Sequence, residues 1–119
     1  MPEFLGTYPR RGEVYWFDFG DPVGSEPASG RPSLVVSRDA GNRTGSVVII
    51  AVMSRSGRDE YPEHVRLPDG LGVQGFVHCG QLVTVSKERL RDFAASLDPL
   101  TMYHVDRALA VALGLPIRT

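Results

Sequence analysis

Short runs of alternating or clustered hydrophobic residues cover most of the chain, and this pattern predicts strands. Five runs rich in β-branched or aromatic residues are bounded by Gly or Pro: residues 13–19, 33–38, 46–53, 63–67 and 76–85. The runs at 33–38 and 46–53 are almost continuously apolar, which is typical of buried strands. The last run contains Gly80, and a glycine within a strand marks a bulge or the close approach of another group.

The carboxyl-terminal part of the chain changes to helical spacing. Within residues 100–113 the apolar side chains recur every three or four positions. Asp98 is a suitable N-cap, Pro99 suits the first helical position, and Gly114 is a stop signal. One helix is therefore predicted after the strands.

Polar connections join these elements. Residues 20–32 form a long loop rich in Gly, Pro and Ser, and a loop of this length in a small domain is usually functional or mobile. Residues 39–45 and 69–75 are predicted as turns. The pattern predicts a single mainly β (α+β) domain over residues 1–119: a small antiparallel barrel with a C-terminal helix, preceded by a flexible tail at residues 1–9.

Charge adds a local feature to this picture. The 119 residues carry a net charge of −1, which excludes a globally basic nucleic-acid binder. Twelve of the 13 basic residues are Arg, and between Arg31 and Arg58 the only acidic residue is Asp39. Arginine presents a planar fork that suits phosphate, so this segment is a candidate anion site, although scattered solvated arginines would look the same.

Several classes of protein and site do not fit the sequence. The longest apolar run, residues 47–53, is too short to span a membrane, and the first residues lack a signal-peptide pattern, which predicts a cytoplasmic protein. The three histidines have no metal-ligand spacing, so neither a metal nor a cofactor is expected. His78 and Cys79 are adjacent on a strand and point to opposite faces, so they cannot form a nucleophile pair.

Two places carry candidate chemistry. Pro32 holds Arg31 extended at the start of a buried strand, where its guanidinium could neutralise a phosphodiester, with Glu26 upstream as a partner. Ser54 follows the buried strand 46–53, and its hydroxyl together with Arg55 could bind a phosphate oxygen. A structural Arg–Glu pair and an ordinary strand-end turn are the alternative interpretations.

An ordered set of residues carries a resemblance to a known family. Its members follow one another along the chain: Arg11–Trp16, Asp18–Phe19, Gly24–Glu26, Arg31–Pro32, Val35–Ser37, Asn42, Tyr61–Pro62, Val65–Leu67, Gln81, Val85–Leu90, Val105–Leu109 and Leu113–Leu115. With this set the sequence resembles the MazF/PemK family of toxin endoribonucleases over residues 10–115. These residues occur in unbroken order along the chain.

The resemblance implies a fold and an activity. The expected fold is an SH3-like/CcdB-like antiparallel barrel that forms a homodimer. The expected reaction is metal-independent, sequence-specific cleavage of single-stranded RNA through attack of the 2′-hydroxyl, which leaves 2′,3′-cyclic phosphate and 5′-hydroxyl ends. The family also implies a cognate antitoxin protein as a partner, in a type II toxin–antitoxin system.

The resemblance also implies roles for individual residues. Arg31 and Ser54 match the catalytic pair, although the family more often has Thr where this chain has Ser54. Loop residues that touch RNA match Phe19, Ser25 and Glu26, and Gln81 is retained where the acidic residue before it is replaced by Gly80. The expected RNA-binding set is Phe19, Ser25, Arg55 and Gln81.

Physical chemistry gives these matches their expected tasks. Arg31 would stabilise charge on the phosphate and Ser54 would orient it. Glu26 is a candidate general base, but it could equally hold Arg31 or read a base. Phe19 could stack on an unpaired base.

Two other functions remain open from the sequence. A non-catalytic SH3-like binding module would have the same fold, because small barrels host many functions. A CcdB-like gyrase inhibitor would also fit the fold, but residues 116–119 lack the terminal Trp and the acidic features expected of that group.

Overall fold

The computed structural model describes residues 4–18 and 30–117. The elements in chain order are β1 (Glu13–Phe17), β2 (Arg31–Val35), α1 (Asp39–Thr44), β3 (Val47–Ser54), β4 (His64–Arg66), β5 (Phe76–Ser86), a 3-10 turn η1 (Lys87–Arg89), β6 (Leu90–Ser96) and α2 (Pro99–Leu113). All five predicted strands are present. The predicted helix is present as α2, with Asp98 accepting a hydrogen bond from Thr101 N (3.3 Å) and Gly114 in the left-handed conformation that ends it.

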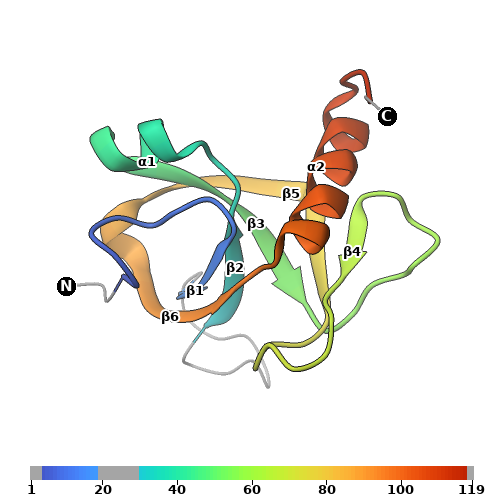
Figure 1. The fold of residues 1–119 in the computed structure, drawn as a ribbon, viewed down its shortest axis with the longest axis horizontal. Coiled ribbons are helices and arrows are strands. Elements are labelled where there is room, and N and C mark those ends of the chain that lie inside the picture. The colour runs from blue at the N-terminus through green and yellow to red at the C-terminus, as the bar shows by residue number, and fades with distance from the viewer. Residues whose placement is uncertain (1–3, 19–29, 118–119) are drawn as a thin grey trace.

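The six strands form one antiparallel sheet in the order β4-β5-β3-β2-β1-β6. Figure 1 shows this sheet strongly curved, with α2 lying across β5 and β4 and α1 set apart from it. The mainly β class with a C-terminal helix is confirmed. Among the described strands β4 and β6 form the two edges, so the sheet curves without closing into a ring.

Two apolar clusters occupy the two faces of the sheet. Consecutive residues of β1 alternate between them: Val14 packs with Leu34 and Met53 in one cluster, while Tyr15 packs with Ile50 in the other. This separation follows from the two-residue period of a strand. The first cluster also receives residues of α2, and this packing fixes the helix on the sheet.

Two elements were not predicted from the sequence. The α1 helix occupies a segment that was expected to be a turn, because Gly41 and Asn42 are poor helix formers and six residues are too few to show a period. Asn42 is buried, and its side chain bonds to Ser37, which ties α1 to the strand before it. The β6 strand (LRDFAAS) has no strong strand pattern and forms because β1 offers it a partner.

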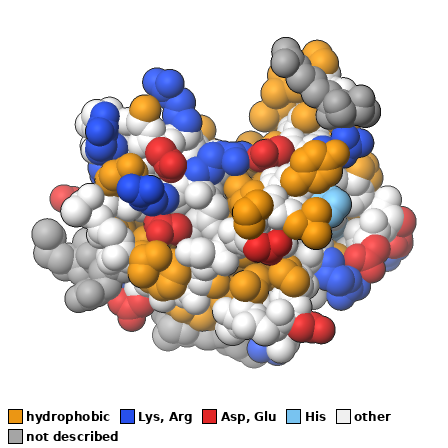
Figure 2. Space-filling view, viewed as in Figure 1, with side chains coloured by type: hydrophobic (Ala, Val, Ile, Leu, Met, Phe, Trp, Pro, Cys, Tyr) orange, Lys and Arg blue, Asp and Glu red, His pale blue; other side chains and the backbone are white. Residues whose placement is uncertain are grey.

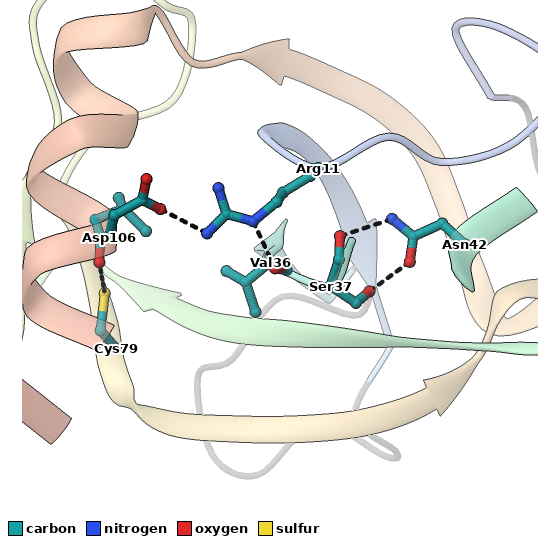
Figure 3. Close-up of polar contacts among 7 residues, drawn as sticks. Arg11, Val36, Ser37, Asn42, Cys79 and Asp106 are labelled. Carbon is teal, nitrogen blue, oxygen red and sulfur yellow. Dashed lines mark hydrogen bonds and ion pairs between the residues drawn. The ribbon is translucent and has the colours of Figure 1, made fainter. Parts of the chain in front are cut away.

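Arg11 joins distant parts of the chain (Figure 3). Its Nε donates to Val36 O at 2.7 Å, and its Nη2 lies 2.6 Å from Asp106 Oδ1 on α2. Within the segment expected to be a tail, the Phe4 ring contacts Tyr15 edge-on at 5.6 Å between centroids, so residue 4 lies against the sheet. These contacts position the start of β1 relative to both faces of the sheet.

Candidate active site

A cleft of about 1150 Å³ opens where β1 and β3 end and β2 begins, facing the loop between β4 and β5. Three segments line it: Trp16 with Gly30, Arg31 and Pro32; Met53, Ser54 and Arg55; and Asp69, Gly70, Gly72, Val73 and Gln74. We call it the Arg31–Ser54 cleft. It brings together the two residues that the sequence singled out on separate strands.

Strand pairing explains why Arg31 and Ser54 meet. Ser33 pairs with Val52 and Leu34 with Ala51 across β2 and β3. Because antiparallel strands run in opposite directions, two further positions along each strand place Arg31 opposite Ser54. The two residues are 23 positions apart in the sequence, yet the register of one strand pair places them at the same end of the sheet.

Backbone packing holds the start of β2. Gly30 has φ +85°, and a Cβ atom at that position would lie 2.2 Å from Phe17 O. Only glycine therefore allows the chain to pass this close to β1. Arg31 then pairs directly with Phe17 in the ladder, so its backbone is fixed at the mouth of the cleft.

A local hydrogen bond orients the hydroxyl of Ser54. Its Oγ accepts a hydrogen bond from Ser56 N at 3.1 Å. A serine hydroxyl can donate one hydrogen bond while it accepts another, so Ser54 can still donate to an oxygen in the cleft.

The opposite wall of the cleft approaches β3 closely. Gly75 has φ +111°, and a Cβ atom there would lie 2.3 Å from Ser54 O and 2.8 Å from Arg55 Cα. The glycine at position 75 is therefore what allows the β4–β5 loop to reach the end of β3.

The two arginines nearest to this wall differ in their partners. Arg66 donates Nε and Nη2 to the carboxylate of Asp59 at 3.0 and 2.8 Å, and these hydrogen bonds raise the pKa of Arg66 and lower that of Asp59. Its guanidinium also lies 4.6 Å from the centre of the Phe76 ring. Arg55 is exposed and makes no ion pair with the described residues, so its charge is available to an anion in the cleft.

A second, smaller cavity of about 340 Å³ adjoins the cleft. Arg55, Asp69 and Gln74 line both. The sequence showed residues 69–75 only as a glycine-rich turn, and neither Asp69 nor Gln74 was predicted to line the site. Trp16 was predicted as a strand residue and as part of the family resemblance but not as a site residue, because its place beside Arg31 and Ser54 becomes visible only once the strands are paired.

The remaining predicted site residues fall into two groups. Phe19, Ser25 and Glu26 lie outside the described residues. Gln81 lies exposed on β5, where the pairing with β3 shifts between Ala51 and Val52, and it is not among the residues lining the cleft. Arg31, Ser54 and Arg55 are the predicted residues that the structure brings together.

The chemistry of the cleft is cationic and hydrogen-bonding. Two guanidinium groups and one hydroxyl can bind an anionic group such as a phosphodiester. Within residues 4–18 and 30–117, no three His, Cys, Asp or Glu side chains gather in a group that could hold a metal ion. Over the same ranges, neither helix has both the length and the apolar character that crossing a membrane requires.

Comparison with known proteins gives a consistent set of relatives. Endoribonuclease EndoA of Bacillus subtilis (strain 168) is 34% identical over 110 residues, which cover 89% of this chain and 95% of that protein. Among solved structures, an endoribonuclease from a mycobacterial species, bound to its cognate antitoxin, superposes with a TM-score of 0.81 at 32% identity over 92% of this chain and 99% of its own. Another mycobacterial endoribonuclease has a TM-score of 0.80 at 31% identity, covering 98% of this chain and 100% of its own.

The family model agrees with these individual similarities. The model for the PemK-like, MazF-like toxins of type II toxin–antitoxin systems matches residues 10–113. This range includes every strand and both helices of the described fold. The curved six-stranded sheet, the C-terminal helix and the sequence match therefore agree, and the chain belongs to the PemK-like, MazF-like toxin family of type II toxin–antitoxin systems.

Proposed function

We propose that this chain acts as one domain and is the toxin of a type II toxin–antitoxin system, a metal-independent endoribonuclease that cuts single-stranded RNA. The observation that carries this proposal is the joint presence of Arg31 and Ser54 in one cleft. Relatives above 30% identity that cover most of the chain are named endoribonucleases, which supports the same activity. We also propose a cytoplasmic location, because the proposed substrate is single-stranded RNA.

The reaction needs no nucleophile from the protein. The 2′-oxygen of the RNA forms a bond to phosphorus while the bond between phosphorus and the 5′-oxygen breaks. The products are a 2′,3′-cyclic phosphate and a 5′-hydroxyl, so one proton leaves the 2′-oxygen and one is gained by the 5′-oxygen. The protein must align the attack and stabilise charge on the non-bridging oxygens.

Arg31 and Ser54 suit these two tasks. The guanidinium of Arg31 supplies a fixed positive charge and a donor for the non-bridging or leaving oxygen. The hydroxyl of Ser54, whose Oγ is held by Ser56 N, donates its own hydrogen to a phosphate oxygen. We assign proton removal to Glu26, whose carboxylate is the candidate general base upstream of Arg31 in the sequence.

Other residues bind the RNA strand. Arg55 contacts a neighbouring phosphate, because it lines the cleft without an ion-pair partner among the described residues. Phe19 stacks on an unpaired base, while Ser25 and Gln81 form hydrogen bonds with bases or sugars.

The proposal includes protein partners. One structural relative was solved with its cognate antitoxin, and we propose the same kind of partner here, together with a homodimer. Exposed apolar side chains on α2 and just after it support a protein-binding surface, and Figure 2 shows hydrophobic side chains gathered over this end of the molecule: Leu100, Tyr103, Val111, Leu113, Leu115 and Ile117.

The decisive experiment measures cleavage of a long RNA by the purified protein in the presence of EDTA, with sequencing of the new 5′ ends. We expect cuts at one short sequence and 5′-hydroxyl ends. Arg31→Ala should lower kcat by at least about a hundredfold, the usual cost of losing a group that stabilises transition-state charge. Arg43→Ala is the matched control, because Arg43 is exposed on α1 and does not line the cleft.

Other outcomes would support the alternative functions. A folded protein that binds RNA without cutting it would favour a non-catalytic SH3-like module. Inhibition of gyrase without RNA cleavage would favour a CcdB-like inhibitor. Full activity of Arg31→Ala, with an unchanged circular dichroism spectrum, would remove Arg31 from the mechanism.

A further inference from the structure

We propose that His78, a buried histidine on β5, is a positioning residue for the hydroxyl of Ser54. The inference rests on the proposed RNA cleavage and adds a residue that does not itself touch the substrate. His78 is 9% exposed and is not among the residues that line the Arg31–Ser54 cleft. It acts on the cleft through the backbone of Ser56.

A chain of two hydrogen bonds connects His78 to Ser54. His78 Nε2 lies 2.8 Å from Ser56 O, and Ser56 N donates to Ser54 Oγ at 3.1 Å. His78 thus holds the carbonyl of the same residue whose amide orients the catalytic hydroxyl. The amide and the carbonyl of Ser56 are therefore both held by hydrogen bonds. Through Ser56, the His78 ring sets the direction in which the Ser54 hydroxyl points.

The partners of the ring determine its tautomer. A carbonyl oxygen can only accept, so Nε2 of His78 must carry the hydrogen. Nδ1 of His78 is buried and has no hydrogen-bond partner among the described residues. A hydrogen on Nδ1 would be buried without an acceptor, so the tautomer that fits this environment carries its hydrogen on Nε2 and donates it to Ser56 O.

The unpartnered nitrogen indicates that the residue has a purpose beyond packing. Burying a polar atom without a partner costs free energy, and an apolar side chain at position 78 would avoid that cost. Its strand neighbours Val77 and Cys79 are fully buried and apolar. The benefit that offsets this cost is the hydrogen bond to Ser56 O, which no apolar residue could make.

Two further contacts fix the segment that follows Ser54. Arg58 N donates to His64 Nδ1 at 3.0 Å, and the His64 ring lies beside His78, with 4.4 Å between centroids. A Cβ atom at Gly57 would lie 2.3 Å from Phe76 Cγ, so the chain at this point runs directly against the aromatic ring. Residues 56–58 thus contact β4 and β5 at three consecutive positions, and the contact with His78, at Ser56, is the one closest to Ser54 in the sequence.

The proposal predicts a specific kinetic pattern. Without the Nε2 donor, the Ser56 carbonyl loses its partner and the Ser54 hydroxyl samples more than one orientation. Binding of RNA through Arg55 should be unaffected, because Arg55 comes before Ser56, the residue whose carbonyl His78 holds. The loss should therefore fall on kcat and leave KM unchanged.

The test compares three variants in steady-state cleavage of a short RNA substrate. His78→Phe keeps a flat ring but removes the donor, and we expect kcat to fall about tenfold, the equivalent of one lost hydrogen bond. His78→Gln places an amide donor where Nε2 lies and should stay within about threefold of the wild type. Cys79→Ala is the matched control on the same strand, with its side chain on the opposite face, and should keep the wild-type kcat.

A double variant separates positioning from a general loss of packing. If His78 acts through Ser54, then His78→Phe should not lower kcat further in a Ser54→Ala background. An equal fold-loss in both backgrounds would overturn the proposal, as would a folded His78→Phe variant with the wild-type kcat. A wild type that does not cut RNA would instead refute the proposed function.

A second comparison applies if His78→Phe does not fold. His78→Asn places its amide where Nδ1 lies, too short to reach Ser56 O, and should lose the kcat that His78→Gln retains. Equal kcat for the Asn and Gln variants would overturn the proposal. In the wild type, long-range 1H–15N spectra should show His78 with its hydrogen on Nε2, and the opposite tautomer would contradict the assigned contact.

Discussion

The sequence resemblance leads us to expect Thr more often than Ser at position 54, and the surroundings of Ser54 show what restrains the smaller side chain. The hydrogen bond from Ser56 N restrains Oγ without help from a methyl group, and the close approach of Gly75 restrains the backbone. The hydroxyl is the shared chemical group of Ser and Thr. The substitution therefore preserves the donor that the proposed mechanism requires.

Two variants at position 54 test whether the hydroxyl of Ser54 is the group that matters for cleavage. Ser54→Ala removes the donor and should lower kcat by about tenfold to a hundredfold, with little change in KM. Ser54→Thr keeps the hydroxyl and should retain activity. Single-turnover cleavage measures both, and an unchanged rate for Ser54→Ala would mean that Ser54 is only a strand-end residue.

Cys79 gives a prediction about stability in alkali. Burial, reinforced by the negative charge of Asp106, raises the pKa of its thiol from 9.0 to about 12. The unfolded chain therefore loses its thiol proton at a lower pH than the folded chain does. Stability that is complete below pH 9 should decline as the pH rises toward 12.

Urea unfolding at about pH 8 and about pH 10 measures this decline in the free energy of unfolding. Cys79→Ala should show a shallower decline than the wild type. Some decline should remain, because burial also raises the pKa of Tyr15. Identical pH dependence in the wild type and Cys79→Ala would show that the thiol does not contribute.

At the scale of elements, two glycines of the β4–β5 loop differ in why glycine is needed there: one only for its backbone conformation, the other also for close packing. Gly72 and Gly75 both have positive φ angles, of +84° and +111°. A Cβ atom at Gly72 would meet open space, whereas one at Gly75 would collide with the backbone of Ser54 and Arg55. A substitution at Gly72 therefore tests the effect of backbone strain alone, and a substitution at Gly75 tests strain together with a collision against the end of β3.

Alanine at each position makes this a matched experiment. Gly72→Ala should cost only the strain of an unfavourable φ, about 1–2 kcal/mol of unfolding free energy. Gly75→Ala should cost more, about 2–4 kcal/mol, and should lower kcat because the end of β3 must move. Equal stability and equal kcat for the two variants would contradict the close approach.

The sequence predicted elements where local pattern is strong. Alternation and β-branched runs located β1 to β5, and the cap at Asp98 with the stop at Gly114 located α2. The pattern did not reveal β6, whose charged and alanine residues resemble a loop until β1 pairs with them. It did not reveal α1 either, which is held by the Asn42–Ser37 hydrogen bonds more than by helix propensity.

For the whole molecule, a net charge of −1 limits how strongly it can attract RNA by electrostatics alone. The arginines are distributed unevenly: Arg31 and Arg55 line the cleft, and Arg66, which lines the adjoining cavity, forms an ion pair with Asp59. RNA binding should therefore involve few phosphates, with base stacking and hydrogen bonds supplying the rest of the affinity.

The salt dependence of binding measures the number of phosphates engaged. For two phosphate contacts on a single strand, log K should fall with log salt with a slope of about −1.4. Arg55→Ala should reduce the magnitude of this slope by about 0.7, and Arg43→Ala should leave it unchanged. A much steeper slope in the wild type would indicate an extended basic surface instead of the cleft.

The sequence alone determined the class of the fold, five of the six strands, the C-terminal helix and the candidacy of Arg31 and Ser54. These features depend on neighbouring residues: the period of a strand, the cap of a helix, and a functional group at the end of an apolar run. Only the tertiary structure decided that Arg31, Ser54 and the glycine-rich loop share one cleft, and that His78 reaches Ser56 O across 22 positions of sequence. Such contacts follow from strand register and chain reversal, which bring distant residues together. They produce no repeating pattern of residues from which the sequence could predict them.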